Sequence, residues 1–419
     1  MRKLITFSVL LIFASIVKGQ DIVKALFLGN SYTAVNTLPL LVARMANNTG
    51  DLLTWSWNTP GGYTLSGHLT SATSVSLIQQ GGWDYVVLQE QSQLPSFTNP
   101  EVESLVFPYA HSLDSMIDLY NPCANTTFYM TWGRKNGDAS NCAVWPPVCT
   151  YEGMDSLLRM RYRMMADTNH ALLSPVGWVW HYLRHNHPSI ELYNPDESHP
   201  SLAGSYVGAA CFYTLFFKND PALITWDSTL NTADALVIRN AVHDIVYDSL
   251  SKWNVGRWDP VADFTLGHNG LQIDFTDQSH YADSWTWDFG DGNFSTVQNP
   301  SHTFTAPGAF NVELKACRCG ICDSVTQVIT VTSAESNLFA KQFFLYPNPA
   351  KDKLILSYTG NDMAFEQFTL MDAQGKIILQ KGKSEGSIDF IDVSKLPSGN
   401  YFLRVFGNKN SALLKFIKE

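Results

Sequence analysis

A short, continuous apolar run near the start of the chain, Ala25-Leu26-Phe27-Leu28, is followed directly by Gly29-Asn30-Ser31-Tyr32-Thr33. Such a run is typical of a strand that is buried on both faces of a parallel sheet, and the turn after it lies where open α/β sheets place their chemistry. Ser31 is therefore predicted at the active edge of a first strand. Taken alone, the turn is equally typical of a helix cap ahead of the apolar stretch 40–46.

A second motif, Asp196-Glu197-Ser198-His199, changes this balance. An aspartate three residues before a histidine can meet it within one turn. The carboxylate then orients the imidazole, sets its tautomer and stabilises the imidazolium that forms when the histidine takes a proton from a serine. Ser31, Asp196 and His199 are thus a candidate catalytic triad, in the chain order of other α/β hydrolases but without their G-x-S-x-G elbow.

These residues resemble the motifs of the SGNH, or GDSL-like, hydrolases over about residues 21–252. The first block of that family, Gly-Asp-Ser, stands here as Gly29-Asn30-Ser31, and its last block, Asp-x-x-His, is unchanged. Segment 58–64 resembles the second block, in which Gly62 is the better match for the glycine whose amide faces the oxyanion. The resemblance implies a serine hydrolase with a three-layer, flavodoxin-like α/β fold around a parallel sheet.

The third block departs from the family pattern Gly-x-Asn-Asp. The expected strand ending at Leu88 leads into Gln-Glu-Gln-Ser-Gln, which resembles a less characterised branch of the family. A carboxamide can donate a hydrogen bond to an oxyanion, so Gln91 is the candidate for the missing asparagine and Gln89 is its rival. The oxyanion hole is therefore expected from the amides of Ser31 and Gly62 and one of the two glutamines.

Other ionisable side chains are expected to play lesser roles. Glu90 would be unfavourable beside an oxyanion unless it points away or pairs with a cation such as Arg134. The histidines of segment 181–187 resemble a metal cluster, but no glutamate lies between them as in the H-E-x-x-H motif, and Pro188 disrupts a helix there. We expect these histidines to lie on a loop or to support the substrate cleft beside Asp196. We expect His68 and His111 to be structural or surface residues, and we expect neither a metal nor a cofactor.

The start of the chain indicates export. Residues 1–19 have the charged, apolar and small-residue parts of a signal peptide. No other stretch approaches the roughly 20 apolar residues of a membrane span, so no integral membrane segment is expected after cleavage. A formal net charge of -10 and the lack of any Lys/Arg-rich run argue against a nucleic-acid partner.

With 419 residues, the chain should hold more than one domain. Residues 20–257 are expected to form the hydrolase-like domain, because strands and helices alternate there. The candidate strands are 23–28, 54–57, 85–89, 127–131 and 171–174. Apolar spacing predicts helices over 155–169 and over 233–253, the latter as one long amphipathic helix.

Two smaller β-sandwiches are expected after this domain. Residues 258–333 contain Trp285-Thr286-Trp287-Asp288-Phe289-Gly290-Asp291-Gly292, which resembles a PKD domain with Trp287 in its core and a turn at 288–292. A polar linker, 334–342, precedes residues 343–419, which resemble the C-terminal sorting domain of type IX secretion. That resemblance implies the type IX machinery as a partner, and a product that is secreted or held at the cell surface.

Seven cysteines in an exported chain favour disulfides. They are Cys123, Cys142, Cys149, Cys211, Cys317, Cys319 and Cys322. A Cys142–Cys149 bond would close a short loop. The three thiolates of 317–322 could instead hold zinc with a fourth group, but a disulfide fits an oxidising compartment better. The pairing remains open at this point.

The parts together predict a secreted serine esterase in which Ser31 attacks an ester carbonyl and His199, oriented by Asp196, moves the proton. Export and the PKD-like module favour an acylated carbohydrate as substrate, with acetyl as the expected acyl group. A lipase or a thioesterase could use the same triad. The alternative from another class is a non-catalytic glycan-binding or adhesion protein of the cell surface.

Overall fold

The computed structural model describes residues 19–332, 339–359, 365–382, 388–407 and 410–419. The expected signal peptide lies outside these residues except for its last position, and so does most of the expected linker 334–342. The chain divides into two compact units, Met1–Trp258 and Asp259–Glu419. Within the described part of the chain, no helix is both long enough and apolar enough to cross a membrane.

A five-stranded parallel sheet in the order β2-β1-β3-β4-β5 is the centre of the first unit. Its strands are β1 (Ile22–Leu28), β2 (Leu52–Asn58), β3 (Tyr85–Leu88), β4 (Asn125–Tyr129) and β5 (Leu172–Ser174). The last four residues of β1 are all buried, as are all four of β3. The strand order reverses beside β1, which is where open α/β sheets of this order place their ligands. The predicted α/β fold class is confirmed.

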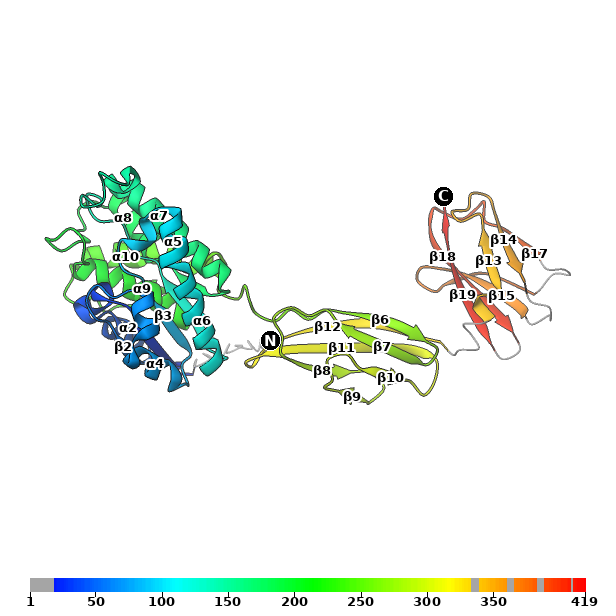
Figure 1. Ribbon diagram of the computed structural model, residues 1–419. Coiled ribbons are helices and arrows are strands. Elements are labelled where there is room, and N and C mark those ends of the chain that lie inside the picture. The colour runs from blue at the N-terminus through cyan, green and yellow to red at the C-terminus, as the bar shows by residue number, and fades with distance from the viewer. Residues whose placement is uncertain (1–18, 333–338, 360–364, 383–387, 408–409) are drawn as a thin grey trace, which may run out of the picture. The chain divides into compact units, whose positions relative to one another are not determined.

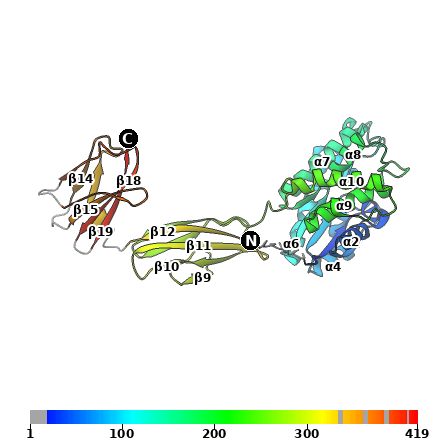
Figure 2. The same ribbon diagram turned by 180° about the vertical axis from the view of Figure 1, so that it is seen from behind.

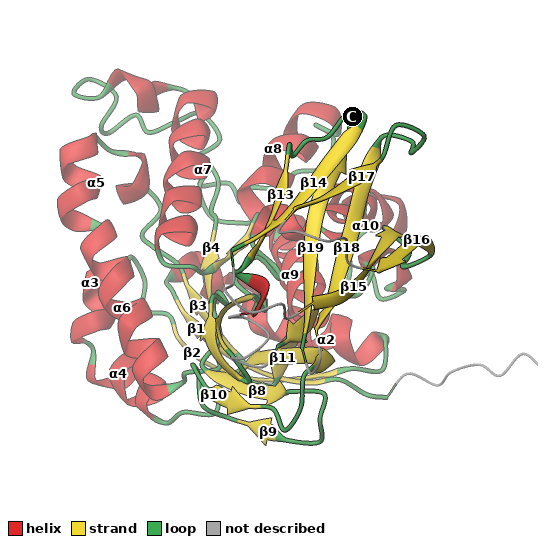
Figure 3. Cartoon of the chain, turned by 90° about the vertical axis from the view of Figure 1, so that its right-hand side faces the viewer, coloured by secondary structure: helices red, strands yellow, loops and turns green. Residues whose placement is uncertain are grey.

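Helices cover both faces of this sheet (Figures 1 and 3). In Figure 3, α4, α6 and α7 lie on one side of the sheet, and α2, α9 and α10 lie on the other. Helix α9 is buried at every position after Leu202, which is typical of a helix that is apolar all round. The helices are α1 (Ser31–Ala34), α2 (Leu38–Asn48), α3 (Leu65–Thr70), α4 (Ala72–Gln79), α5 (Asn99–Leu105), α6 (Phe107–Tyr120), α7 (Tyr151–Thr168), α8 (Val176–Asn186), α9 (Leu202–Phe217) and α10 (Thr232–Ile245).

The long helix expected over 233–253 is not continuous. Helix α10 ends at Ile245, and a 3-10 segment, η5 (Tyr247–Trp253), follows it. Ser249 leaves the helical region with φ -138°, which redirects the chain. Trp253 is thereby buried, and its indole N–H donates to the carbonyl oxygen of Ile245 at 2.8 Å. Amphipathic spacing alone does not reveal this break, because both segments present apolar residues to the same core.

The second unit contains two antiparallel β-sandwiches, which Figures 1 and 2 show from opposite sides. The sheets of the first are β10-β7-β6 and β12-β11-β8-β9, and those of the second are β13-β14-β17 and β16-β15-β18-β19. Their strands are β6 (Phe264–Asn269), β7 (Gln272–Asp277), β8 (Ser284–Asp288), β9 (Phe294–Ser295), β10 (Ser301–Thr303), β11 (Gly308–Arg318), β12 (Ile321–Val331), β13 (Phe343–Tyr346), β14 (Lys353–Tyr358), β15 (Phe365–Asp372), β16 (Ile377–Gly382), β17 (Ile388–Asp392), β18 (Gly399–Gly407) and β19 (Ser411–Lys418).

Trp287 is the centre of the first sandwich, as predicted. Its side chain is fully buried between Phe264 and Phe275, whose ring centroids lie 5.1 and 5.3 Å from the indole. The turn after β8 needs a glycine at position 290, because φ there is +75° and a Cβ atom would lie 2.4 Å from the carbonyl oxygen of Asn311. The predicted turn at 288–292 is thus explained by backbone geometry.

Each of the two units contains a disulfide bond. Cys142 and Cys149 close a short loop in the first unit. Cys317 and Cys322 are bonded across directly paired positions of β11 and β12. This bond uses two of the three thiols that could have formed a zinc site in 317–322. Cys211 is a buried free thiol of α9, and burial raises its pKa above the usual range.

Candidate active site

Ser31 is the first residue of α1 and follows β1, an inner strand, at the carboxyl edge of the sheet. Asn30 caps this short helix, because its side-chain oxygen accepts a hydrogen bond from the Tyr32 amide at 3.1 Å. The turn is therefore both a helix cap and the place of the candidate nucleophile. The serine begins a helix and also lies where parallel α/β sheets carry their reacting groups.

The structure brings Ser31, His199 and Asp196 together. The Nε2 atom of His199 lies 2.8 Å from the Ser31 hydroxyl oxygen, and its Nδ1 atom lies 2.5 Å from one carboxylate oxygen of Asp196. An ionised carboxylate only accepts, so Nδ1 carries the proton and Nε2 is left to accept from the serine. This is the tautomer that a general base needs.

Asp196 is held in its ionised form by its own turn. Its other carboxylate oxygen accepts from the amides of Ser198 and His199 at 3.1 and 2.9 Å. Burial on its own would raise the pKa of Asp196, but the hydrogen bonds from the side chain and amide of His199 and from the Ser198 amide outweigh it and lower the pKa. The turn that aims these amides passes through Glu197 in the left-handed region, at φ +59°.

Aromatic side chains support the loop that carries the histidine. The Tyr32 hydroxyl lies 2.7 Å from the Ser198 hydroxyl, and the Trp132 indole N–H donates to the Ser198 carbonyl at 3.1 Å. The Tyr32 and Trp132 rings are stacked with centroids 4.8 Å apart, and Trp132 stacks on Trp180 at 3.7 Å. No sequence pattern assigns a role to these two residues. Their only signal was position, since Tyr32 adjoins Ser31 and Trp132 lies just after β4.

Two backbone amides that the sequence suggests for an oxyanion hole have no acceptor among the described residues. Within the part of the chain that the structure describes, the amides of Ser31 and Gly62 donate to no protein acceptor. Gly62 lies in the turn after β2 with φ +68°, and no other group lies within 4 Å of where its Cβ would be. An amide in such open surroundings can donate to a bound substrate.

The two candidate glutamines are engaged elsewhere in this arrangement. The fully buried Gln89 donates from Nε2 to the Asn30 side-chain oxygen at 2.9 Å and to the Glu90 carbonyl at 2.6 Å. Gln91 donates from Nε2 to the Ser92 hydroxyl at 3.4 Å and to the Gln93 side-chain oxygen at 3.1 Å. Each carboxamide therefore binds its own loop or its neighbour rather than presenting a free N–H group.

Glu90 is fully buried and points away from solvent. Its carboxylate accepts from the amides of Gln91 at 2.6 Å and Leu65 at 3.2 Å. Burial raises the pKa of Glu90 to about 8, against the opposing effect of the two amides. Arg134 is not its partner, because that guanidinium pairs with Asp138 at 3.3 Å. The carboxyl group thus links the segments that follow β2 and β3.

Of the histidines in segment 181–187, His181 and His185 lie on α8, which ends at Asn186 ahead of Pro188, and His187 is the C-cap of this helix. His181 pairs through Nδ1 with the buried Asp155 of α7 at 3.0 Å, and His185 binds the His181 carbonyl at 2.7 Å through its own Nδ1. The helix therefore forms in spite of the proline, which lies beyond its last turn.

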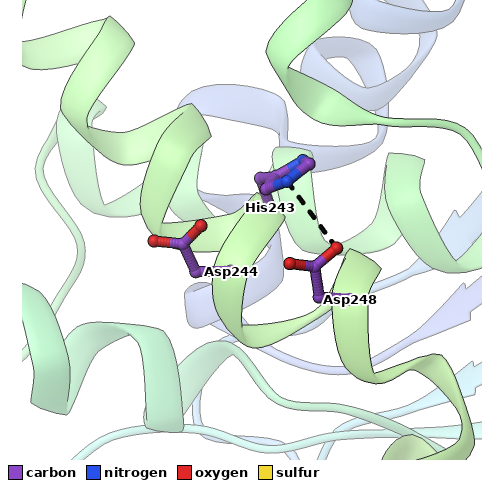
Figure 4. Close-up of side chains that lie close together, drawn as sticks. All are labelled: His243, Asp244 and Asp248. Carbon is purple, nitrogen blue, oxygen red and sulfur yellow. Dashed lines mark ion pairs between the residues drawn. The ribbon is translucent and has the colours of Figure 1, made fainter.

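A cluster of His243, Asp244 and Asp248 near the end of α10 has ligand atoms within 4.8 Å of one another. The Nδ1 atom of His243 lies 2.8 Å from Asp220. Its Nε2 atom faces Asp248 at 3.6 Å (Figure 4). The hydrogen bond to Asp220 is the main cause that raises the pKa of His243. Exposed acidic groups of this kind are common without a metal ion, and His243 already has a hydrogen-bond partner in Asp220, so we assign no metal here.

Comparison with protein-family models identifies both modules of the second unit. Residues 259–333 match the PKD domain, and residues 344–419 match a secretion system C-terminal sorting domain. The last module is a sorting domain. It directs type IX secretion, to the cell surface or the extracellular space. The predicted partner machinery and localisation are confirmed in these terms.

Solved structures are similar to parts of the chain. A DUF4886 family protein from Bacteroides uniformis is 14% identical, with a TM-score of 0.47, over 54% of this chain and 95% of that one. A proposed SGNH hydrolase from Slackia heliotrinireducens is 26% identical, with a TM-score of 0.39, over 46% and 98%. The PKD1 domain from the Vibrio cholerae metalloprotease PrtV is 32% identical, with a TM-score of 0.18, over 18% and 99%. The comparison with curated proteins gives no match.

Proposed function

We propose that the first unit is a serine esterase of the SGNH type. The observation that carries this proposal is the continuous hydrogen-bonded line from Asp196 through His199 to the Ser31 hydroxyl, with separations of 2.5 and 2.8 Å. Nucleophile, base and orienting acid are each in contact with the next. A nucleophile that contacts a base held by a third group is the signature of covalent acyl transfer.

The chemistry follows from the protonation states. The Ser31 oxygen attacks the ester carbonyl while Nε2 of His199 takes its proton, and the tetrahedral oxyanion accepts hydrogen bonds from the amides of Ser31 and Gly62. The intermediate collapses as His199 returns the proton to the leaving alcohol. Water then attacks the acyl-enzyme with His199 as base, which releases the acid and restores the serine hydroxyl. Asp196 stays ionised throughout and stabilises the imidazolium.

The substrate class we propose is an acylated carbohydrate, with acetyl as the acyl group. Support comes from the domains that follow the first unit in the chain. They are a PKD domain and a sorting domain that directs export. An exported hydrolase meets polymers outside the cell, and hydroxyl-linked acyl groups on glycans are esters that a serine triad can cleave. The signal peptide and the boundaries 20–257, 258–333 and 343–419 form part of this proposal.

The test compares purified wild type with Ser31→Ala and with Ser104→Ala, a surface serine on α5. Each is assayed for acetate release from an aryl acetate and from a panel of acetylated polysaccharides. We expect Ser31→Ala alone to lose activity by about 1,000-fold or more. A serine-reactive phosphonate should label wild type and not Ser31→Ala. Turnover that survives in Ser31→Ala would contradict the proposed esterase activity. Turnover that depends on Ser31 but occurs with the aryl ester alone would contradict the proposed carbohydrate substrate.

A further inference from the structure

We propose that His68 is a positioning residue of the nucleophile: as a neutral donor it fixes the peptide group before Asn30, and so sets where Ser31 points. The inference rests on the proposed esterase and deepens it. His68 lies on α3, at the carboxyl end of β2, while Ser31 follows β1. The two strands are neighbours in the sheet, which brings the segments after them together.

The peptide group between Gly29 and Asn30 is held at both of its polar atoms. Its carbonyl oxygen accepts from Nε2 of His68 at 2.9 Å, and its N–H donates to the side-chain oxygen of Gln89 at 3.0 Å. All three side chains at this point are buried, with exposed fractions of 2% for Asn30 and 0% for His68 and Gln89. A peptide plane fixed from both sides cannot rotate without breaking a buried hydrogen bond.

The tautomer of His68 is determined by its partners. A carbonyl oxygen can only accept, so Nε2 of His68 carries the proton. Nδ1 must then accept from the Ser74 hydroxyl at 2.8 Å, and that hydroxyl in turn accepts from the Asn58 side-chain amide at 2.8 Å. Burial lowers the pKa of His68 to about 4, so the ring is neutral at the near-neutral pH of ester hydrolysis.

The backbone at Gly29 is tightly enclosed by neighbouring side chains. A Cβ atom on Gly29 would lie 2.6 Å from the Thr33 hydroxyl and 2.7 Å from the Gln89 side-chain oxygen. Only glycine therefore fits at position 29. The residues that follow it place the Ser31 hydroxyl beside His199. An error of about 1 Å in the position of a reacting group can cost on the order of 100-fold in rate.

The experiment removes the donor of His68 while filling its space. His68→Leu has no N–H group, whereas His68→Gln places an amide N–H at about the reach of Nε2. We expect kcat of His68→Leu on an aryl acetate to fall about 10- to 100-fold with KM changed less than threefold, and the rate of phosphonate labelling of Ser31 to fall in parallel. His68→Gln should keep kcat within about fivefold of wild type.

Two further variants keep the outcome decisive. Asn121→Leu removes another buried donor to a backbone carbonyl, that of Ile78, at the opposite edge of the sheet, and should lower the melting temperature without lowering kcat. Ser74→Ala leaves the imidazole in place but removes its Nδ1 partner, so it tests the inference even if His68→Leu does not fold. We expect it to lower kcat about three- to tenfold.

The inference is overturned if His68→Leu and Ser74→Ala match wild type, or if folded His68→Leu and His68→Gln lose kcat equally, since the shape of the ring and not its donor would then matter. Loss of kcat in Asn121→Leu to the same degree would also overturn it. Each of these results can occur while Ser31→Ala is inactive, and the proposed esterase activity would then still hold. Activity in Ser31→Ala would instead contradict the proposed esterase activity.

Discussion

Gln89 and Asn30 are joined by two hydrogen bonds that run in opposite directions. The Asn30 amide donates to the Gln89 side-chain oxygen at 3.0 Å, and the Gln89 side-chain nitrogen donates to the Asn30 side-chain oxygen at 2.9 Å. The same Asn30 oxygen caps the helix that begins with Ser31. The residue after β3 thus shapes the turn after β1.

This pairing predicts different effects for the two glutamines. Gln89→Leu should lower kcat by about 10-fold or more, because the Asn30 amide loses its acceptor and the cap of α1 loses its support. Gln91→Leu should lower kcat less, since its carboxamide binds within its own loop. The check is kcat of both variants on one aryl ester, with melting temperatures alongside. A larger loss in Gln91→Leu would show that Gln91 moves to the oxyanion during catalysis.

Asp196→Asn should lower kcat about 1,000- to 10,000-fold without loss of fold. A carboxamide can donate to Nδ1 of His199, and the ring then carries its proton on the wrong nitrogen. Glu197→Gln is the matched control, because Glu197 is the adjacent acid and is exposed. Steady-state kinetics at neutral pH would decide, and a loss below 10-fold in Asp196→Asn would contradict the assigned role.

Glu90→Gln should stabilise the protein increasingly as the pH rises. The carboxyl group has an ordinary pKa of 4.5 and a folded-state pKa of about 8. Between these values the folded chain keeps a proton that the unfolded chain releases, so the stability of wild type falls as the pH rises through this window. Denaturant unfolding at pH 5 and pH 8 should show a gain on the order of a few kcal/mol at the higher pH. An equal effect at both values would contradict burial of the neutral acid. Glu101→Gln, at an exposed glutamate, is the control.

The charge of His243 should also make the stability of wild type fall as the pH rises, in this case because an ion pair is lost. Asp220 raises the pKa of His243, so the ion pair contributes stability that is fully present below the ordinary histidine pKa and is lost as the pH rises through the folded-state value. His243→Gln should therefore melt below wild type at pH 6 and match it at pH 9. Asp220→Asn should reproduce this pattern. A deficit that persists unchanged at pH 9 would point to packing and not to charge.

Trp287→Ala should unfold the PKD domain and spare the hydrolysis of small esters. The indole is fully buried, and removing such a side chain costs about 3–5 kcal/mol. The triad lies in the other unit, so kcat on an aryl acetate should stay within twofold. Two-step thermal unfolding, with only one transition shifted, would verify this. Loss of aryl esterase activity would show that the units depend on one another.

The sequence predicts β1 and β3 well because each of them contains a short, continuous apolar run. The expected strand 23–28 falls within β1, and the expected strand 85–89 ends one residue beyond β3. The helix expected at 155–169 is α7, which starts four residues earlier because Thr150 caps it. The break at Ser249 was not predicted, since apolar spacing continues across it.

Spacing could place Asp196 beside His199, because one turn joins them. Only the strand order could bring His68, Gln89 and Asn30 together, and strand order is a long-range property that no local pattern encodes. The choice between Gln89 and Gln91 stays open in the sequence for the same reason. Residue type shows what a carboxamide can donate, but its partner depends on which loop lies beside it.

The triad unites residues 168 positions apart in the chain. Ser31 lies near one end of the first unit, and the histidine that activates it arrives only with the segment just before α9. An incomplete or unfolded chain therefore carries an ordinary, unreactive serine. In the proposed esterase, hydrolysis therefore depends on the assembled sheet, and a chain that has not yet folded does not cleave esters.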